Sequence, residues 1–449
     1  MLRKSFDLYL NTKIKKINNK IIIDSDKSIS IRSFLIGAIS NNISSVKNVL
    51  ESDDVMSTID SLKKLGVKIK KKGVKKYIIY GKGLGSLSSH LNQQLNFGNS
   101  GTLARLLVGI LSTTPNINIK IKGDHSLNKR SMKKLIILMS NFGATFLPKK
   151  KFKLPLRLVS SSMPIGINYK AGVSAQLKSA VILAGLNSYG NTKITELKKS
   201  RDHTENMLLR NSQSIRIKKG NNKLITIFGK KQLEPIKINV PGDPSSAAFF
   251  AALSLLKEKS SLEIENVGLN PTRIGFYQIL KKHGAKIKFL NKLKQNNEIS
   301  GKIVINCSKI KPLKVSKKYY TNSTDEYPIM FVIAALTKGT SVFKGINDLA
   351  NKESNRITEM QKILNQLNIK SSFSNDTLKI FGKGLFSAKD KNILVKNLGD
   401  HRICMSSFVL ALLTGAKLKI KNFETVFTSS PSFLKNMKKL GVKFEIQKL

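Results

Sequence analysis

The sequence predicts an α/β protein of two lobes, each built from three copies of a βαβαβ-like unit around buried central helices. Three observations support this prediction. One pattern recurs about every 70–80 residues along the chain. Every copy opens with a polar loop and a helix of small and apolar residues, and most copies end with an amphipathic helix, a glycine and a short strand. A helix without a polar face is normally buried on all sides, whereas an amphipathic helix covers a sheet and keeps one face in water.

The six copies follow one another from the first polar loop to the C-terminal strand. The polar loops lie at 26–32, 96–105, 173–178, 241–246, 325–328 and 399–402. The apolar helices are expected at 34–39, 103–111, 179–186, 247–256, 329–336 and 403–413. The amphipathic helices are expected at 57–65, 132–141, 204–211, 274–283, 356–367 and 431–440. Six copies divide into a first lobe of residues 25–241 and a second lobe of residues 1–24 and 242–449, with the active site expected in the cleft between them.

The polar loop comes before the apolar helix in every copy, so we expect the helix N-termini of each lobe to emerge on one surface. Free backbone N–H groups and the helix dipole make such an N-terminus attractive to anions. The loop at 96–105 adds Gly98 and Gly101, which let the backbone approach a ligand closely, and Arg105 follows about one turn inside the helix. Six positive helix ends around one cleft would suit a multiply anionic ligand.

The formal charge of +52 first suggests a nucleic acid or an anionic membrane as partner. The basic residues are, however, spread over the whole chain, and nearly all of them are lysines, which indicates a solvated lysine surface. Arginine is scarce, so a retained arginine is a candidate for two-point binding of a carboxylate or phosphate.

Several classes of protein are excluded by what the sequence lacks. Its 2 cysteines give neither a disulfide framework nor a metal motif, and there is no Walker loop and no Gly-x-Gly-x-x-Gly loop. The N-terminus has no apolar core of signal-peptide length, and no apolar run reaches the roughly 18 residues of a membrane span. We therefore expect a soluble cytoplasmic protein that handles phosphate groups without a metal or other cofactor.

Residues suited to phosphate and carboxylate binding gather at the polar loops and at three further clusters. They are Lys27, Ser28, Arg32, Asn99, Gly101, Arg105, Ser174, Gln176, Asp325 and Arg402, with the clusters 129–130, 201–205 and 352–356. Asp325 and Glu353 are candidates for proton transfer. Each residue also has a plainer interpretation: Ser174, Ser245 and Asp325 as helix N-caps, Glu353 as a surface partner of Lys352, and His203 and His401 as structural residues.

These motifs together resemble one family, the 5-enolpyruvylshikimate-3-phosphate (EPSP) synthases, over essentially the whole chain. The motifs that carry the resemblance are 26–28 with Arg32, 98–102 with Arg105, 123–124 with Arg130, 174–178, 201–205, 270–273, 325–328, 352–354 with Arg356, and 399–402. The Ser-Ala-Gln-x-Lys and Arg-x-His-x-Glu patterns are similar to the second variant (class II) of the family. The sequence departs from that variant at Ser25, Leu106, Ser131 and Asn355, and none of these departures removes a charged candidate.

The resemblance implies a two-lobed enolpyruvyl transferase-like fold of six βαβαββ units and a monomer without cofactor. It also implies a reaction: transfer of the enolpyruvyl group of phosphoenolpyruvate to the 5-hydroxyl of 3-phosphoshikimate, with release of phosphate. Gly101 has the form usual in glyphosate-sensitive members, which implies moderate sensitivity.

The resemblance assigns three sets of residues. Those for 3-phosphoshikimate are Lys27, Ser28, Arg32, Ser174, Ala175, Gln176, Arg201, Asp325 and Lys352. Those for phosphoenolpyruvate are Lys27, Gly101, Arg130, Gln176, Arg356 and Arg402. The catalytic set is Asp325, which would take the proton of the attacking hydroxyl, Glu353, which would exchange a proton at the methylene carbon, and Lys27.

Two other functions were weighed against this one. The enolpyruvyl transferase that acts on UDP-N-acetylglucosamine shares the architecture but typically uses a loop cysteine, and residues 123–130 contain none. An RNA-binding or RNA-end-processing protein would fit the charge of +52. It should interleave aromatic residues with a basic stripe to stack bases, but the aromatic residues are scattered and tryptophan is absent. We therefore expect no nucleic-acid or membrane partner.

Overall fold

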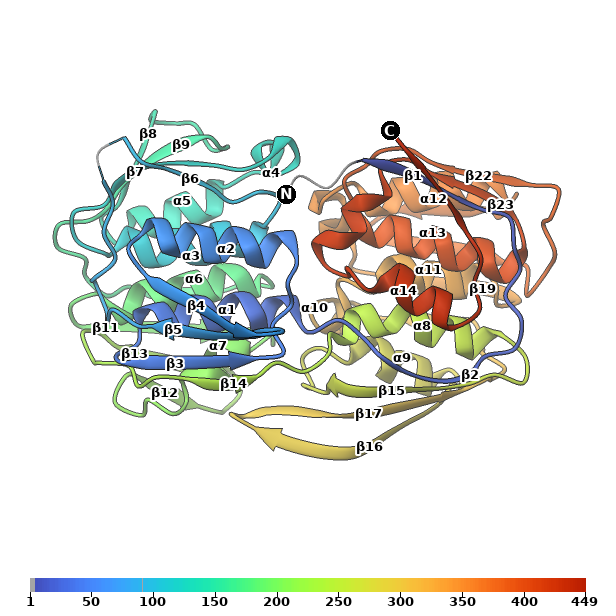
Figure 1. The fold of residues 1–449 in the computed structure, drawn as a ribbon, viewed down its shortest axis with the longest axis horizontal. Coiled ribbons are helices and arrows are strands. Elements are labelled where there is room, and N and C mark those ends of the chain that lie inside the picture. The colour runs from blue at the N-terminus through green and yellow to red at the C-terminus, as the bar shows by residue number, and fades with distance from the viewer. Residues whose placement is uncertain (1–4, 91) are drawn as a thin grey trace. The chain divides into compact units, whose positions relative to one another are not determined.

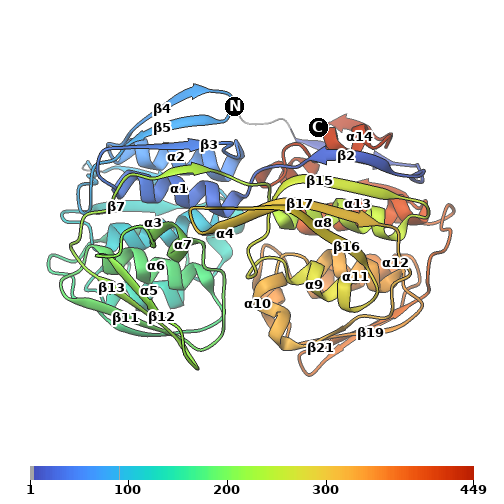
Figure 2. The same cartoon turned by 90° about the horizontal axis from the view of Figure 1, so that it is seen from below.

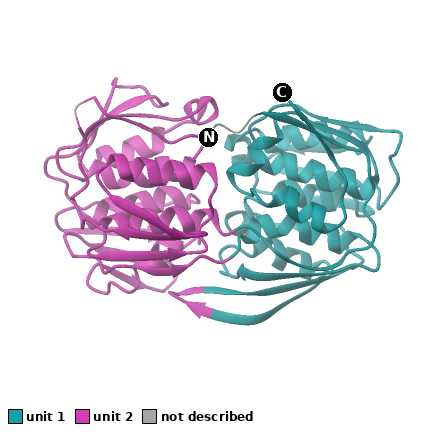
Figure 3. Cartoon of the chain, viewed as in Figure 1, with its two compact units in different colours: residues 1–24, 242–293, 299–449 teal, residues 25–241, 294–298 magenta. Residues whose placement is uncertain are grey.

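The computed structural model describes residues 5–90 and 92–449 of the chain. In these residues, six four-stranded sheets and the helices between them belong to two compact units (Figures 1 and 3). One consists of Ser25–Pro241 and Lys294–Glu298 and is here called the 25–241 unit. The other consists of Gly242–Leu293, Ile299–Leu449 and the N-terminal residues up to Asp24, and is called the 242–449 unit.

The three sheets of the 25–241 unit share one pattern, in which the first two strands are parallel and the later pairs are antiparallel. The first sheet has the order β14 (Lys237–Asn239), β3 (Ile43–Lys47), β5 (Lys76–Tyr80), β4 (Lys68–Gly73). The second has the order β6 (Gln94–Asn96), β7 (Asn118–Lys122), β9 (Leu156–Val159), β8 (Thr145–Leu147). The third has the order β10 (Asn168–Ala171), β11 (Asn191–Glu196), β13 (Lys223–Phe228), β12 (Ile215–Lys218).

The sheets of the 242–449 unit repeat this arrangement and include the two N-terminal strands. One has the order β2 (Asn18–Ile22), β15 (Ser261–Gly268), β17 (Glu298–Asn306), β16 (Lys286–Gln295). The next has the order β18 (Lys314–Val315), β19 (Gly339–Lys344), β21 (Thr377–Gly382), β20 (Ser371–Ser374). The last has the order β22 (Asn392–Val395), β23 (Lys417–Ile420), β1 (Phe6–Leu10), β24 (Glu445–Lys448). The N-terminal strands therefore complete sheets formed by residues beyond 242.

The first helix of each copy lies in the middle of its unit (Figures 1 and 2). In the 25–241 unit these helices are α1 (Lys27–Ile39), α3 (Gly101–Ser112) and α6 (Ala175–Leu186), and α3 contacts both of the others. In the 242–449 unit they are α8 (Pro244–Leu256), α11 (Tyr327–Ala335) and α13 (His401–Thr414), which contact one another. Every residue of α8, α11 and α13 is buried, which confirms the prediction of buried central helices.

In the chain, the second helix of each copy comes after the strand that follows the central helix and before the last strands of its sheet. These helices are α2 (Asp53–Lys64), α5 (Lys133–Ser140), α7 (His203–Leu208), α9 (Gly275–Lys282), α12 (Arg356–Gln366) and α14 (Phe433–Lys439). Short helices at α4 (His125–Lys129) and α10 (Tyr320–Ser323) and 3-10 turns at Lys317–Tyr319, Asn347–Asn351 and Phe423–Thr428 complete the chain. Within residues 5–90 and 92–449, no helix is both long and apolar enough to cross a membrane.

Most helices begin a few residues from the predicted position, and the largest difference is at α1, which begins at Lys27 instead of residue 34. Two of these differences have a clear local reason. The helix α11 begins at Tyr327, inside the stretch predicted as a loop, because Pro328 occupies the first turn, where its missing N–H costs nothing. The helix α2 begins at Asp53, four residues early, because Asp53 and Asp54 place negative charge at the positive end of the helix dipole.

Candidate active site

Side chains cap most of the central helices at their N-termini. Asp26, Ser100, Ser174, Asp243 and Asp400 each accept a hydrogen bond from an N–H of the first turn of their helix. The N-cap role predicted for Ser174 is confirmed. The same role is wrong for two other residues. Ser245 lies inside the first turn of α8 and donates its own N–H to Asp243 over 2.8 Å, and Glu326, not Asp325, stands at the cap position of α11.

Arg32 joins three helices of the 25–241 unit and is almost fully buried. Its Nε donates to Thr204 Oγ1 on α7 over 2.9 Å, and its Nη2 donates to Ser179 Oγ on α6 over 3.2 Å. Its Nη1 donates to the carbonyl of Ser28 in the first turn of α1 over 3.1 Å. The neighbouring Lys27 forms an ion pair with Asp54 of α2, with 2.9 Å between Nζ and Oδ2. The start of α1 is thus held against α2, α6 and α7.

The N-termini of α3 and α6 are linked directly, because Gln176 Nε2 donates to Thr102 Oγ1 over 2.9 Å. Ala175 is the first residue of α6, next to the capping Ser174. The hydrogen bond between Gln176 and Thr102 therefore places the start of α6, with Ser174 and Ala175, beside the first turn of α3, which contains Gly101.

Two guanidinium groups lie against Gly101. Arg105 Nη1 donates to the Gly101 carbonyl over 3.0 Å, and Arg130 Nη2 donates to Asn99 Oδ1 and, over 3.2 Å, to Ser126 Oγ. A Cβ atom on Gly101 would lie 2.7 Å from Arg105 Nη1 and 3.2 Å from Arg130 Nη1. The absence of a side chain at this position is what lets both arginines close over the start of α3.

In the 242–449 unit, Arg356 forms ion pairs with three carboxylates. Its Nε lies 2.9 Å from Asp400 Oδ2, its Nη2 lies 2.6 Å from Glu353 Oε2, and its Nη1 lies 3.7 Å from Asp325 Oδ1. Burial lowers the pKa of Arg356, but Asp400, Glu353 and Asp325 outweigh it and raise the pKa, so the guanidinium stays charged. Asp400 is buried, whereas the side chains of Asp325 and Glu353 keep 24% and 22% of their surface exposed. The two proton-transfer candidates are therefore adjacent and reach solvent.

Arg402 is a buried cation with unused hydrogen-bond donors. It is 4% exposed, and its guanidinium lies 5.9 Å from the centre of the Phe249 ring. In the part of the chain that the structure describes, its Nε and Nη1 have no hydrogen-bond partner. Because an unsatisfied buried donor is costly, this arrangement fits a group that an anion completes.

Lys352 does not pair with Glu353, so the plain interpretation of Glu353 as its surface partner is wrong. Lys352 Nζ lies 2.6 Å from Asp348 Oδ2, one turn earlier, and 5.9 Å from the centre of the Tyr320 ring. Glu353 instead reaches forward to Arg356, three residues later, because Arg356 is the buried cation nearest to it along the chain.

Arg201 lies in a loop, whereas His203 and His401 are the first residues of helices α7 and α13. Arg201 is half-buried and lies between Ser200 and Asp202, the residue before α7. His203 Nδ1 lies 2.7 Å from Glu298 Oε1 within the 25–241 unit, and His401 is buried in the first turn of α13. Both histidines therefore fit the structural role that the sequence favoured.

Sequence reasoning missed the residues that hold the candidates in place. Asp54, which pairs with Lys27, carries no local signal that connects it to α1. Thr204 and Asp400 belong to motifs that were recognised, but their contacts with Arg32 and Arg356 could not be derived from spacing. Asn355 replaces a residue that is usually Asp, and it still caps α12 by accepting from the Thr358 N–H over 3.2 Å.

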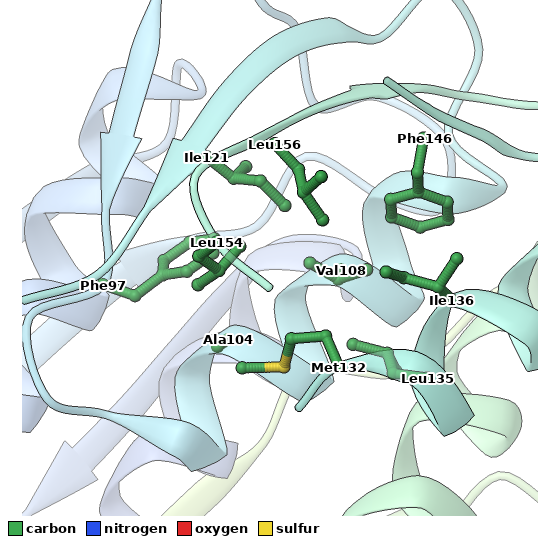
Figure 4. A pocket seen from close by; sticks show the side chains of 10 residues that line it. All are labelled: Phe97, Ala104, Val108, Ile121, Met132, Leu135, Ile136, Phe146, Leu154 and Leu156. Atoms are coloured by element: carbon green, nitrogen blue, oxygen red, sulfur yellow. The ribbon is translucent and has the colours of Figure 1, made fainter. Parts of the chain in front are cut away.

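An enclosed apolar pocket beside α3 is not a ligand site. Side chains from α3, α5, β7 and β9 surround it, among them Val108, Ile136 and Leu156 (Figure 4). Its volume is about 10 Å³, which is barely enough for one water molecule. The pocket is a small gap in the packing between α3 and the sheet that contains β7 and β9. Among the described residues there is also no group of three or more His, Cys, Asp and Glu placed to hold a metal ion.

Comparison with known proteins identifies the family. Residues 11–437 match the sequence profile of the family described as EPSP synthase (3-phosphoshikimate 1-carboxyvinyltransferase). The 3-phosphoshikimate 1-carboxyvinyltransferase of Zymomonas mobilis subsp. mobilis is 36% identical over 442 residues, which cover 97% of this chain and 97% of that protein. The chain belongs to the EPSP synthase family.

Solved structures agree with this membership. An EPSP synthase from Acinetobacter baumannii matches with a TM-score of 0.84 at 32% identity, covering 99% of this chain and 100% of that one. The enolpyruvyl transferase NikO from Streptomyces tendae matches with a TM-score of 0.77 over 99% of this chain, but at 12% identity this likeness shows the fold alone. The two-lobed enolpyruvyl transferase-like fold predicted from the sequence is confirmed, and the UDP-N-acetylglucosamine alternative is not favoured.

Proposed function

We infer that this chain transfers the enolpyruvyl group of phosphoenolpyruvate to the 5-hydroxyl of 3-phosphoshikimate and releases phosphate. The observation that carries this conclusion is membership of the EPSP synthase family over residues 11–437. The arrangement within each unit supports it, because cations lie at the N-termini of the central helices, where a phosphate or carboxylate would be held. The protein is proposed to act as a cytoplasmic monomer without cofactor, metal, nucleic acid or membrane.

The proposed 3-phosphoshikimate residues lie mainly in the 25–241 unit. They are Lys27, Ser28, Arg32, Ser174, Ala175, Gln176 and Arg201, with Asp325 and Lys352 from the 242–449 unit. Hydrogen bonds among α1, α6 and α7 support the first group, since they fix Arg32 between the start of α1, which carries Ser28, and the helices α6 and α7. Rigid placement of this kind lowers the entropic cost of holding a substrate.

The proposed phosphoenolpyruvate residues come from both units, and they are Lys27, Gly101, Arg130, Gln176, Arg356 and Arg402. The unused donors of the buried Arg402 support its role, because a carboxylate or phosphate would satisfy them. Arg130 supplies a second planar cation next to the open face of Gly101. We therefore also propose that both units contribute residues to one active site.

Addition and elimination require proton transfers that Asp325 and Glu353 can supply. Asp325 would accept the proton of the 5-hydroxyl as its oxygen bonds to C2 of phosphoenolpyruvate, while a proton is added to the methylene carbon, C3. Loss of a proton from the resulting methyl group and cleavage of the C2–O bond to phosphate would then restore the double bond. Glu353 is proposed for the exchange at C3, and Lys27 and Arg356 would stabilise the charge that develops.

The test is phosphate release by the purified chain supplied with both substrates. We expect release that depends on 3-phosphoshikimate and on phosphoenolpyruvate together, with formation of the enolpyruvyl ether detected by mass. A folded protein that releases no phosphate under these conditions, or that accepts UDP-N-acetylglucosamine instead, would contradict the proposed function.

A further inference from the structure

A lysine and two glutamates form a fully buried charge cluster behind the 3-phosphoshikimate residues of the 25–241 unit. Lys178 lies one turn inside α6, and its side chain is 0% exposed. Its Nζ lies 2.6 Å from Glu196 Oε1 at the end of β11 and 2.7 Å from Glu205 Oε1 on α7. Lys223 of β13 approaches from the outside, with its Nζ 3.2 Å from Glu205 Oε1.

Stability alone explains this cluster poorly. Burying charged groups carries a large desolvation penalty, and replacing a buried ion pair by apolar residues of similar volume is often neutral or stabilising. Burial lowers the pKa of Lys178, but Glu205 and Glu196 outweigh it and raise the pKa, so the ammonium stays charged at neutral pH. The Lys178 ammonium thus stays charged in a place where apolar side chains could fill the same volume.

Each member of the cluster is connected to a proposed substrate residue. Glu196 Oε1 also accepts from the N–H of Ser200 over 2.9 Å and from its hydroxyl over 2.7 Å, and Ser200 directly precedes Arg201. The cluster therefore fixes the end of the loop that carries Arg201.

The other two members lead to Arg32. Glu205 follows Thr204 and Lys178 precedes Ser179 in the sequence. The Thr204 hydroxyl donates to Ser179 Oγ over 2.8 Å, and the same two hydroxyls accept the hydrogen bonds of Arg32. The ion pair between Lys178 and Glu205 therefore holds together the two helices whose hydroxyls orient the Arg32 guanidinium.

We propose that Lys178, Glu196 and Glu205 are positioning residues that set the affinity for 3-phosphoshikimate by fixing Arg32 and Arg201 relative to the start of α6. This inference rests on the proposed function. The cluster touches no substrate itself. It acts mainly on 3-phosphoshikimate, because its contacts lead to Arg32 and Arg201 and not to Arg130, Arg356 or Arg402, while Gln176 on the same helix is held separately by its hydrogen bond to Thr102.

The test compares Lys178→Met with the unaltered full-length chain. Calorimetry without phosphoenolpyruvate gives the Kd for 3-phosphoshikimate, and steady-state phosphate release gives KM for each substrate. We expect a Kd for 3-phosphoshikimate that rises by about tenfold or more, since a displacement of about 1 Å can cost as much as about 100-fold, and a KM for phosphoenolpyruvate that stays within about threefold.

Three further variants separate positioning from general destabilisation. Lys178→Met with Glu205→Gln removes opposite charges together, so it should recover stability but keep the weak 3-phosphoshikimate binding. Ser200→Ala leaves the ion pairs intact and should raise the Kd by a few fold, which provides a result even where Lys178→Met does not fold. Lys302→Met is the matched control, because Lys302 also bridges two glutamates, Glu263 and Glu265, but lies in the other unit.

Unchanged 3-phosphoshikimate affinity in folded Lys178→Met and Ser200→Ala proteins would overturn the inference, and so would equal losses for both substrates. An unaltered chain that neither binds 3-phosphoshikimate nor releases phosphate would instead refute the proposed function, and the inference with it. Selective loss for 3-phosphoshikimate, together with normal behaviour of Lys302→Met, would establish the positioning role.

Discussion

A methyl group at Gly101 should weaken phosphoenolpyruvate binding without harming the fold. The Cβ of Gly101→Ala would lie 2.7 Å from Arg105 Nη1 and 3.2 Å from Arg130 Nη1, whereas ordinary contacts begin near 3.4 Å. Arg105 must therefore retreat by about 0.7 Å and Arg130 by about 0.2 Å, and displacements of this size lower activity by roughly 5- to 30-fold when a 1 Å error costs about 100-fold. Because both contacts are ends of flexible side chains, the backbone need not move.

The stability of Gly101→Ala should stay the same or rise. Gly101 begins α3 with a backbone that is not in the left-handed region, and alanine in such a position gains up to about 0.5–1 kcal/mol through the unfolded state. The assay is phosphate release with phosphoenolpyruvate varied at saturating 3-phosphoshikimate, combined with thermal unfolding. A KM for phosphoenolpyruvate within twofold of the unaltered chain, or a lowered Tm, would refute this reasoning.

Four other predictions follow from the same structure. Asp325→Ala should lower kcat by about 100-fold or more while the Kd for 3-phosphoshikimate changes by less than about tenfold, and normal turnover would exclude the general-base role. Gly109→Ala should cost about 1–3 kcal/mol in denaturant unfolding, because its Cβ would lie 2.6 Å from the Ala180 carbonyl oxygen, which belongs to rigid helix backbone. Burial raises the pKa of Glu196, but Lys178 outweighs it and lowers the pKa below 4.5, so the stability from this carboxylate is present above pH 4.5 and is lost as the pH falls. Acid unfolding of Glu196→Gln should therefore depend less steeply on pH, and an unchanged slope would contradict this. Glyphosate should inhibit the enzyme with moderate potency, and inhibition only at millimolar concentrations would contradict the expectation from Gly101.

The six copies could be predicted from the sequence because their signals are local. A polar loop followed by small residues on all faces predicts each central helix, and these features lie within about 15 residues of each other. The helix at Tyr327 began earlier than expected because Pro328 was interpreted as a loop residue although it also suits a first helical turn. Local signals therefore predict which elements the chain forms better than they predict where each element begins and ends.

The partners of the candidate residues could not be predicted in the same way. Arg356 is bound to Asp400, which lies 44 residues away, and Arg32 is bound to Thr204, which lies 172 residues away. Such pairs depend on how the copies pack and not on spacing within a copy. The sequence thus provided the candidate residues for the chemistry, whereas the hydrogen bonds that hold them required the structure.

The pairing of the N-terminal strands with C-terminal strands determines the order in which the two units can fold during synthesis. Leu8 of β1 pairs with Ile420 on one side and with Ile446 on the other, so β1 is synthesised before the whole 25–241 unit but finds both of its neighbours only after that unit has been made. The 25–241 unit needs no strand beyond β14 for its three sheets and can fold while the rest of the chain is still being made. During that interval the β1 segment, whose Phe6, Leu8 and Leu10 are buried in the folded chain, has unpaired backbone groups that can pair with another strand.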